Sequence, residues 1–130
     1  MDEPCILVVE SDVLIRQPLA EYLRECGYKV IEALNPGEAR QLLAERHASI
    51  DIVLVDVDAP GENGFALAQW IRTNNPDIAI ILAGTIAATT EKASELCEDG
   101  PTLAKPYDHR FLLDRIRSLL AGRKSARRMD

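Results

Sequence analysis

Acidic residues and one lysine follow short apolar runs at separate points of the chain. Asp56 and Asp58 follow the apolar residues 52–55, Glu10 follows a similar run near the N-terminus, and Lys105 follows a short one near the C-terminus. A carboxylate that ends an inside strand is held rigidly at the sheet's edge, where ligands bind in parallel sheets. Such a group can act as a metal ligand, a nucleophile or a phosphate acceptor.

These residue types together favour phosphoryl chemistry. Carboxylate oxygens suit a hard divalent ion, and Mg²⁺ with several retained waters is the natural choice. A metal and a lysine beside an aspartate would neutralise a phosphoryl group, and phosphoryl transfer needs chiefly positioning and neutralisation. No histidine is suitably placed as a general base, and no glycine-rich phosphate loop or CxxC motif is present. The arrangement requires the first and third strands to be neighbours.

Strand and helix patterns alternate five times along the chain. Strands are expected over residues 5–9, 29–32, 51–56, 78–83 and 102–104. Helices are expected over residues 12–27, from Pro36 onward, and over 65–73, 89–98 and 108–122. The alternation and the apolar central runs indicate an α/β domain whose parallel sheet is covered on both faces.

Four details of the first helix can be predicted from local signals. Asp12 is expected to cap the first helix and Gly27 to end it, whereas Pro18 should kink it. Cys26 is expected on the inward face of this helix, with Leu19 and Leu23.

Length and composition indicate one globular domain. The 130 residues are 47% hydrophobic and carry a net charge of −6, which argues against general binding to nucleic acid or anionic membranes. The three cysteines (Cys5, Cys26 and Cys97) fit reduced thiols in a cytosolic protein. No stretch approaches the length of a membrane span, so a cytoplasmic protein is expected. Residues 1–122 should form the domain and residues 123–130 a flexible basic tail.

Three sequence blocks resemble a known family. Residues 6–12, 51–64 and 103–107 are similar, in order and spacing, to the receiver domain of bacterial two-component response regulators. The resemblance extends from residue 5 to about residue 121. It implies a three-layer (βα)5 flavodoxin-like fold with strand order 2-1-3-4-5. It also implies that Asp56 accepts a phosphoryl group from a phosphohistidine on a sensor histidine kinase or a histidine-phosphotransfer protein.

The resemblance implies individual roles as well. Glu10 and Asp56 would be acidic Mg²⁺ ligands, and the main-chain carbonyl of Asp58 would complete the set of ligands that the protein supplies. Lys105 would pair with the phosphoryl oxygens, at an angle set by a cis bond to the next residue. Gly64 would allow a tight turn into the third helix. The resemblance implies a structural role, without direct contact to metal or phosphate, for Pro60, Gly64 and Pro106.

Three positions depart from the family's pattern. Ser11 stands where a second acid is usual, so its hydroxyl would be a weaker metal ligand. Gly84 stands at the position of the switch hydroxyl, a role that Thr85 would take only if the loop slips by one residue. Thr102 stands where an aromatic residue normally swings inward or outward.

These departures leave three functional hypotheses. The first is a receiver that takes phosphate on Asp56 and signals by contact with a downstream protein, with a homodimer left open. It would be no enzyme, beyond catalysing its own phosphorylation and dephosphorylation, and the early end of the chain predicts no attached output domain. The second is a degenerate pseudo-receiver that binds its partner without phosphorylation. The third is a haloacid-dehalogenase-like phosphatase, for which Asp56-Val57-Asp58 would be the Asp-x-Asp signature.

Overall fold

The structure is a computed structural model, and it describes residues 3–46, 49–56, 64–84, 103–104 and 109–128. The strands are β1 (Cys5–Val9), β2 (Lys29–Ala33), β3 (Ile52–Asp56), β4 (Ala79–Gly84) and β5 (Leu103–Ala104). The helices are α1 (Val13–Glu25), α2 (Pro36–Arg46), α3 (Gly64–Asn74) and α5 (His109–Arg128). The helix expected over residues 89–98 lies outside the described residues.

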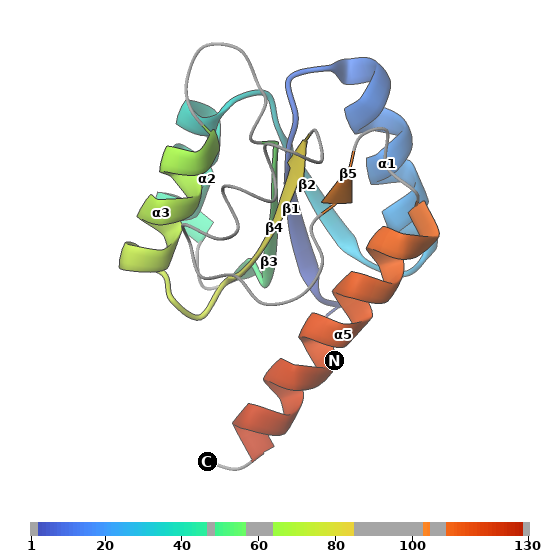
Figure 1. Ribbon diagram of the computed structural model, residues 1–130, viewed down its shortest axis with the longest axis vertical. Helices are drawn as coiled ribbons and strands as arrows, with labels where there is room; N and C mark the ends of the chain where they lie inside the picture. The colour runs from blue at the N-terminus through green and yellow to red at the C-terminus, as the bar shows by residue number, and fades with distance from the viewer. Residues whose placement is uncertain (1–2, 47–48, 57–63, 85–102, 105–108, 129–130) are drawn as a thin grey trace.

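The five strands form one parallel sheet in the order β2-β1-β3-β4-β5, which confirms the predicted topology. Helices α1 and α5 cover one face of the sheet, and α2 and α3 cover the other (Figure 1). The domain is therefore the three-layer α/β fold expected from the alternating pattern. All the strands end at the same edge of the sheet, because they are parallel.

The central strands are buried on both faces, as their unbroken apolar runs predict. Successive side chains point to opposite faces of a strand, so each strand contributes to two cores. Leu7, Val53 and Val55 pack on the side of α2 and α3. Ile6 and Leu54 pack on the side of α1 and α5. The two cores fix both layers of helices on the sheet, and with them the edge where the strands end.

Helix α1 begins and ends at the predicted residues. The Asp12 carboxylate accepts a hydrogen bond from the Leu14 amide at 2.9 Å, which is the geometry of an N-cap. At the other end, Gly27 adopts a φ of 98°, and the Tyr28 amide donates to the Leu23 carbonyl at 3.2 Å. This is a Schellman ending, in which a left-handed glycine reverses the chain.

One prediction about α1 needs correction, and another stays a prediction. The helix runs from Val13 to Glu25 as one element with Pro18 inside it, and the kink expected at Pro18 is not tested by these bounds. Cys26 is exposed instead of facing inward, because it is the C-cap and the chain already turns away at Gly27. The apolar stripe of this helix therefore ends at Leu23.

Side chains also tie the strands and α2 in place. The Asn35 side chain accepts a hydrogen bond from the Glu38 amide at 2.8 Å and so caps α2. The Asp51 carboxylate accepts one from the Cys5 amide at 2.9 Å, which joins the start of β1 to the start of β3. Burial raises the pKa of the Cys5 thiol, and the nearby Asp51 carboxylate raises it further. The thiol is thereby kept protonated and weakly reactive.

Helix α5 is longer than predicted. We expected it to end at Gly122, whereas it continues to Arg128 and projects beyond the sheet (Figure 1). Gly27 is the one glycine with positive φ in the described part of the chain, so Gly122 does not act as a helix stop. The basic residues that follow favour a helix C-terminus, where the macrodipole attracts cations. The division into a domain of residues 1–122 and a tail of residues 123–130 remains a prediction.

Within the described ranges, no helix is both long enough and apolar enough to cross a membrane. The longest helix, α5, has 20 residues and contains several charged ones.

Alanine substitutions at Gly27, which ends α1, and at Gly122, which lies within α5, should have opposite effects. Gly27→Ala should destabilise the fold by about 1 kcal/mol or more, because its φ of 98° strains any residue with a Cβ. Gly122→Ala should stabilise it by about 0.5–1 kcal/mol, because a Cβ there meets open space inside a helix. Urea unfolding of both variants measures this, and equal shifts would contradict the assigned helix ends.

Candidate functional site

The register of the sheet brings Glu10 and Asp56 to neighbouring positions. Strands β1 and β3 pair in parallel up to Val9 and Val55, so the next residues along the two strands are Glu10 and Asp56. Asp56 is the last residue of β3 and is paired on its other side with Ala83 of β4. The sequence prediction that both acids end neighbouring central strands is therefore confirmed.

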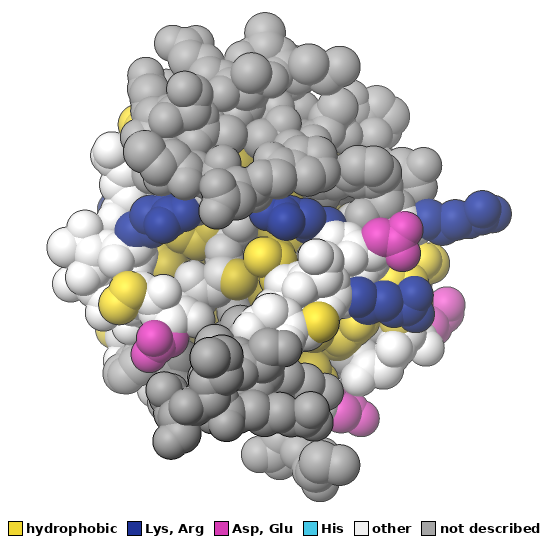
Figure 2. Space-filling view, turned by 60° about the horizontal axis from the view of Figure 1, so that its bottom comes forward, with side chains coloured by type: hydrophobic (Ala, Val, Ile, Leu, Met, Phe, Trp, Pro, Cys, Tyr) yellow, Lys and Arg dark blue, Asp and Glu magenta, His cyan; other side chains and the backbone are white. Residues whose placement is uncertain are grey.

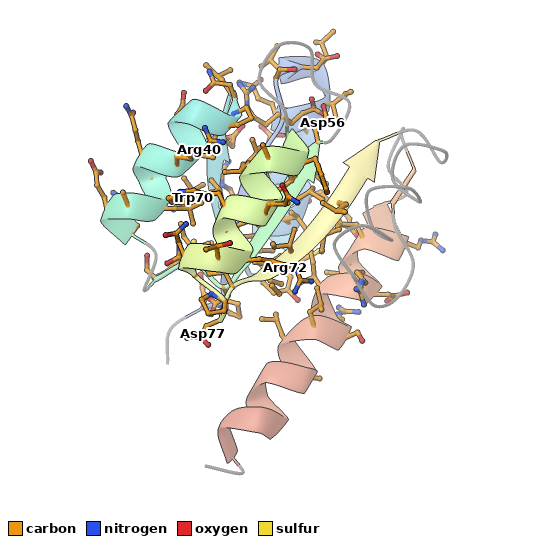
Figure 3. All side chains as sticks on the ribbon, turned by 60° about the vertical axis from the view of Figure 1, so that its left-hand side comes forward. Arg40, Asp56, Trp70, Arg72 and Asp77 are labelled. Carbon is orange, nitrogen blue, oxygen red and sulfur yellow. The ribbon has the colours of Figure 1, made fainter. Side chains whose placement is uncertain are left out.

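Both carboxylates are buried. Glu10 is 1% exposed and Asp56 is 4% exposed, and with Arg16 they make up the buried charged side chains of the described residues. Figure 3 shows Asp56 at one end of the sheet, with Arg72 and Asp77 towards the opposite end. Burying a charge is costly unless it is compensated, so a fold rarely retains such groups without a specific role. Their clustering marks the carboxyl edge of β1 and β3 as the candidate site.

Glu10 is held by hydrogen bonds at three of its polar groups. Its amide donates to the Ala33 carbonyl at the end of β2, at 3.1 Å. Its carboxylate oxygen Oε2 accepts from the Asp12 amide at 3.2 Å. Its carbonyl accepts a buried hydrogen bond from Nη1 of Arg16 at 2.9 Å. The main chain and the carboxylate of Glu10 are therefore both fixed in direction.

Arg16 is a site residue that our sequence reasoning missed. It lies three and seven positions before Leu19 and Leu23, so it belongs to the buried stripe of α1. Its Nε donates to Glu32 of β2 at 3.1 Å, which compensates the buried guanidinium. The available signal was an arginine at helical spacing within an apolar stripe, which indicates a buried charge with a partner.

Gly64 matters because of the space around it. A Cβ at this position would overlap the main-chain oxygen of Asp56 and lie 3.0 Å from its carbonyl carbon and 3.1 Å from the Val55 side chain. The tight turn that we expected Gly64 to permit lies outside the described residues and stays a prediction. Gly64 itself is the first residue of α3, and its φ is not in the left-handed region. Its missing side chain lets α3 start directly against the end of β3.

The other predicted site residues fall into two groups. Ser11 is exposed between β1 and α1, and Gly84 ends β4 one residue beyond the partner of Asp56. The Asp12 carboxylate caps α1. The residues outside the described ranges are Asp58, Pro60, Thr85, Thr102, Lys105 and Pro106.

Two adjacent carboxylates are a donor set that fits Mg²⁺. The ion prefers oxygen ligands and is commonly held by one or two carboxylates together with waters and substrate phosphate oxygens. Glu10 and Asp56 would be those carboxylates. Over the described ranges, the structure contains no cluster of three or more acidic, histidine or cysteine side chains that could hold a metal. An all-protein metal cage is therefore not formed by these residues.

A hollow lies at the opposite end of the sheet. It encloses about 220 Å³ and is lined by Arg72, Pro76, Ile78, Ala79, Ile80 and Leu119. Figure 2 looks towards this end of the molecule, where Lys and Arg side chains are interspersed with hydrophobic ones. A ligand site usually combines apolar walls with several convergent polar groups. Arg72 is the one charged residue of this lining, so the carboxyl edge remains the stronger candidate.

Comparison with known proteins gives a consistent family assignment. The sequence model described as the response regulator receiver domain matches residues 6–117. The transcriptional regulatory protein GltR of Pseudomonas aeruginosa is 37% identical over 119 residues, which are 88% of this chain and 48% of GltR. The aerobic respiration control protein ArcA of Escherichia coli is 31% identical over 121 residues, 93% of this chain and 50% of ArcA. The chain thus spans about half the length of these relatives.

A solved structure agrees with the sequence comparison. The signal receiver domain of an HD domain-containing protein from Pseudomonas fluorescens superposes with a TM-score of 0.85 at 30% identity. The match covers 98% of this chain and 94% of that one. The similarity therefore includes the whole sheet and the edge at which Glu10 and Asp56 lie.

Proposed function

Because the chain belongs to the response regulator receiver family of two-component systems, we propose that Asp56 accepts a phosphoryl group from a phosphohistidine. The observation that supports this proposal best is the position of Asp56. It ends the central strand β3, is 4% exposed and lies next to the second buried acid, Glu10. An oxygen of the Asp56 carboxylate forms the new O–P bond as the P–N bond of the phosphohistidine breaks.

The residues around Asp56 would bind the metal ion and the phosphoryl oxygens. Glu10 and Asp56 would hold Mg²⁺ with the main-chain carbonyl of Asp58, and the ion would neutralise charge on the phosphoryl oxygens. Lys105 pairs with the same oxygens. Ser11 is a neutral ligand in place of an acid, so the proposal includes a lower Mg²⁺ affinity than two flanking acids would give. The missing side chain of Gly64 lets α3 begin against the main chain of Asp56.

Exposed apolar side chains lie beside this edge. Val13, Leu14 and Leu34 are the large hydrophobic residues found exposed in the described part of the chain, and Leu14 is 82% exposed. Val13 and Leu14 open α1 just after the residues that follow β1, and Leu34 directly follows β2. Exposed apolar groups close to a site often contact a partner. We assign them to docking of the phosphodonor, a sensor histidine kinase or a histidine-phosphotransfer protein.

Leu14→Asp should slow phosphotransfer from a phosphorylated histidine-phosphotransfer protein by about tenfold, the effect of losing one interface anchor. The variant should fold normally, because an acid in the first turn suits the helix dipole. Phosphorylation by a small acyl-phosphate donor should be unchanged. Gln17→Asp, an exposed change on the same helix, is the control. Equal loss with both donors would show that Leu14 acts on the site and not on docking.

The proposed function is tested by incubating the protein with a small acyl phosphate and Mg²⁺ and mapping the product by mass spectrometry. The expected result is one phosphoryl group on the peptide that contains Asp56, absent when Mg²⁺ is chelated. A protein that stays unmodified, or carries the group elsewhere, would refute the proposal.

One observation favours a second candidate, the pseudo-receiver. Ser11 is exposed and the Asp12 carboxylate is engaged in capping α1, so neither supplies the second acid that the family usually has. A pseudo-receiver would bind its target equally well with or without Mg²⁺, and with Asp56→Asn. Measurable Mg²⁺ binding that strengthens when a phosphoryl mimic is added would decide against it.

A further inference from the structure

Arg16 forms the link between the metal-binding edge and the outer strand of the sheet. It is 9% exposed, and its guanidinium donates from Nη1 to the Glu10 carbonyl and from Nε to the Glu32 carboxylate. Its own amide donates to the Asp12 carbonyl at 2.8 Å. One side chain therefore contacts the residue that carries a proposed metal ligand and the neighbouring strand β2.

Glu32 is itself fixed by a second arginine. Nη2 of Arg24 donates to Oε2 of Glu32 at 3.3 Å and to the Val30 carbonyl at 3.0 Å. Arg24 is more exposed than Arg16, and its hydrogen bonds run to Glu32 and Val30 instead of to Glu10. Both arginines thus bind the Glu32 carboxylate, but of the two only Arg16 also donates a hydrogen bond to the main chain of Glu10. The two arginines form a natural pair of test and control.

We propose that Arg16 is a positioning residue of the metal site, and that it holds Glu10 in the direction required to bind Mg²⁺. The proposal rests on the proposed function, in which Glu10 and Asp56 are the acidic ligands. Partners that orient a metal ligand commonly change metal affinity by about 10–100-fold. Their effect should be large here, because Ser11 is neutral and Asp12 caps α1, which leaves Glu10 as the acid directly after β1.

The Glu10 carboxylate offers a way to follow its position without metal. Oε2 of Glu10 accepts the Asp12 amide, so a displaced Glu10 would release that amide. Hydrogen exchange of the Asp12 amide in metal-free protein therefore reports the position of Glu10. Mg²⁺ affinity, measured by calorimetric titration, reports the consequence for the site.

The experiment compares Arg16→Met with Arg24→Met in the full chain. Methionine keeps an unbranched apolar stem and a high helix propensity but removes the donors. Arg16→Met should weaken Mg²⁺ binding by about tenfold or more and speed exchange of the Asp12 amide. Arg24→Met, which removes a more exposed ion pair, should change both by less than about twofold.

A purely structural role would give a different kinetic result. If Arg16 positions Glu10, Arg16→Met raises the Mg²⁺ concentration for half-maximal phosphorylation, while the maximal rate at saturating Mg²⁺ stays within about twofold of wild type. A merely structural contact would lower stability and the maximal rate without moving the Mg²⁺ dependence. Arg16→Lys keeps one donor near Glu10 and should be intermediate, and it carries the test if Arg16→Met does not fold.

The outcomes separate this proposal from the proposed function. If Arg16→Met and Arg24→Met have the same Mg²⁺ affinity and the same exchange at Asp12, the positioning role is overturned. If the wild type binds Mg²⁺ but takes no phosphoryl group, the phosphoacceptor function fails, whereas the comparison of affinities still decides the role of Arg16. If the wild type binds no Mg²⁺, both proposals are overturned.

Discussion

Replacing Asp56 by asparagine is expected to abolish phosphorylation by an acyl-phosphate donor. The two side chains have nearly the same shape, so the buried position at the end of β3 should be retained. The amide is not a nucleophile and carries no charge to hold a metal, so the O–P bond cannot form. Intact-mass spectrometry after incubation with donor and Mg²⁺ should show the added phosphoryl group on the wild type and none on Asp56→Asn.

Asp58→Asn is the matched control and also separates the phosphatase hypothesis. A receiver that uses only the main-chain carbonyl at position 58 should still be phosphorylated when the side chain becomes an amide. An Asp-x-Asp phosphatase needs that second carboxylate as acid and base, so Asp58→Asn would stop its turnover of phosphate esters. Residual labelling of Asp56→Asn at another carboxylate would contradict the assignment of Asp56 as acceptor.

Gly64→Ala is expected to cost about 3 kcal/mol or more of stability, at the upper end of the range for overpacking. The added methyl group would overlap the Asp56 carbonyl oxygen, which is main chain and cannot rotate away. Relief requires α3 to move from the end of β3. Urea unfolding should therefore show a lower midpoint, and the rate of Asp56 phosphorylation should fall with it.

Gly122→Ala provides the control for this substitution, because a Cβ there meets no atom within 4 Å. The same substitution should therefore stabilise α5 when it is made at Gly122 and displace α3 when it is made at Gly64. If Gly64→Ala were as stable and as readily phosphorylated as the wild type, α3 would have to start farther from Asp56 than the structure shows.

The parts of the fold that depend on local signals could be predicted from the sequence. The central strands were predicted from continuous apolar runs, and the roles of Asp12 and Gly27 from the chemistry of helix ends. The neighbouring positions of Glu10 and Asp56 followed from the strand order that the family resemblance implied. Each of these signals involves few residues and one dominant physical effect, such as apolar burial or hydrogen bonding at a helix end. They can therefore be recognised from the sequence.

Other features depend on contacts between distant segments. The role of Gly64 is set by its distance from Asp56, which no property of the glycine itself reveals. Arg16 was missed because its partners come from β2 and from the end of β1. The length of α5 was underestimated because a glycine can either end a helix or lie within one, and only its φ distinguishes these cases.

The parallel register has a consequence for how the protein folds. No strand pair here can form through a tight turn, and the pairing of β1 with β3 closes the longest stretch of chain, since Ile6 meets Ile52 46 positions later. Doubling a loop costs only about 0.6 kcal/mol in closure entropy, but distant contacts slow folding markedly. This same pairing places Glu10 beside Asp56. The acidic pair is therefore assembled by the most non-local step of the folding reaction, and the chain cannot acquire it before its sheet is joined at the centre.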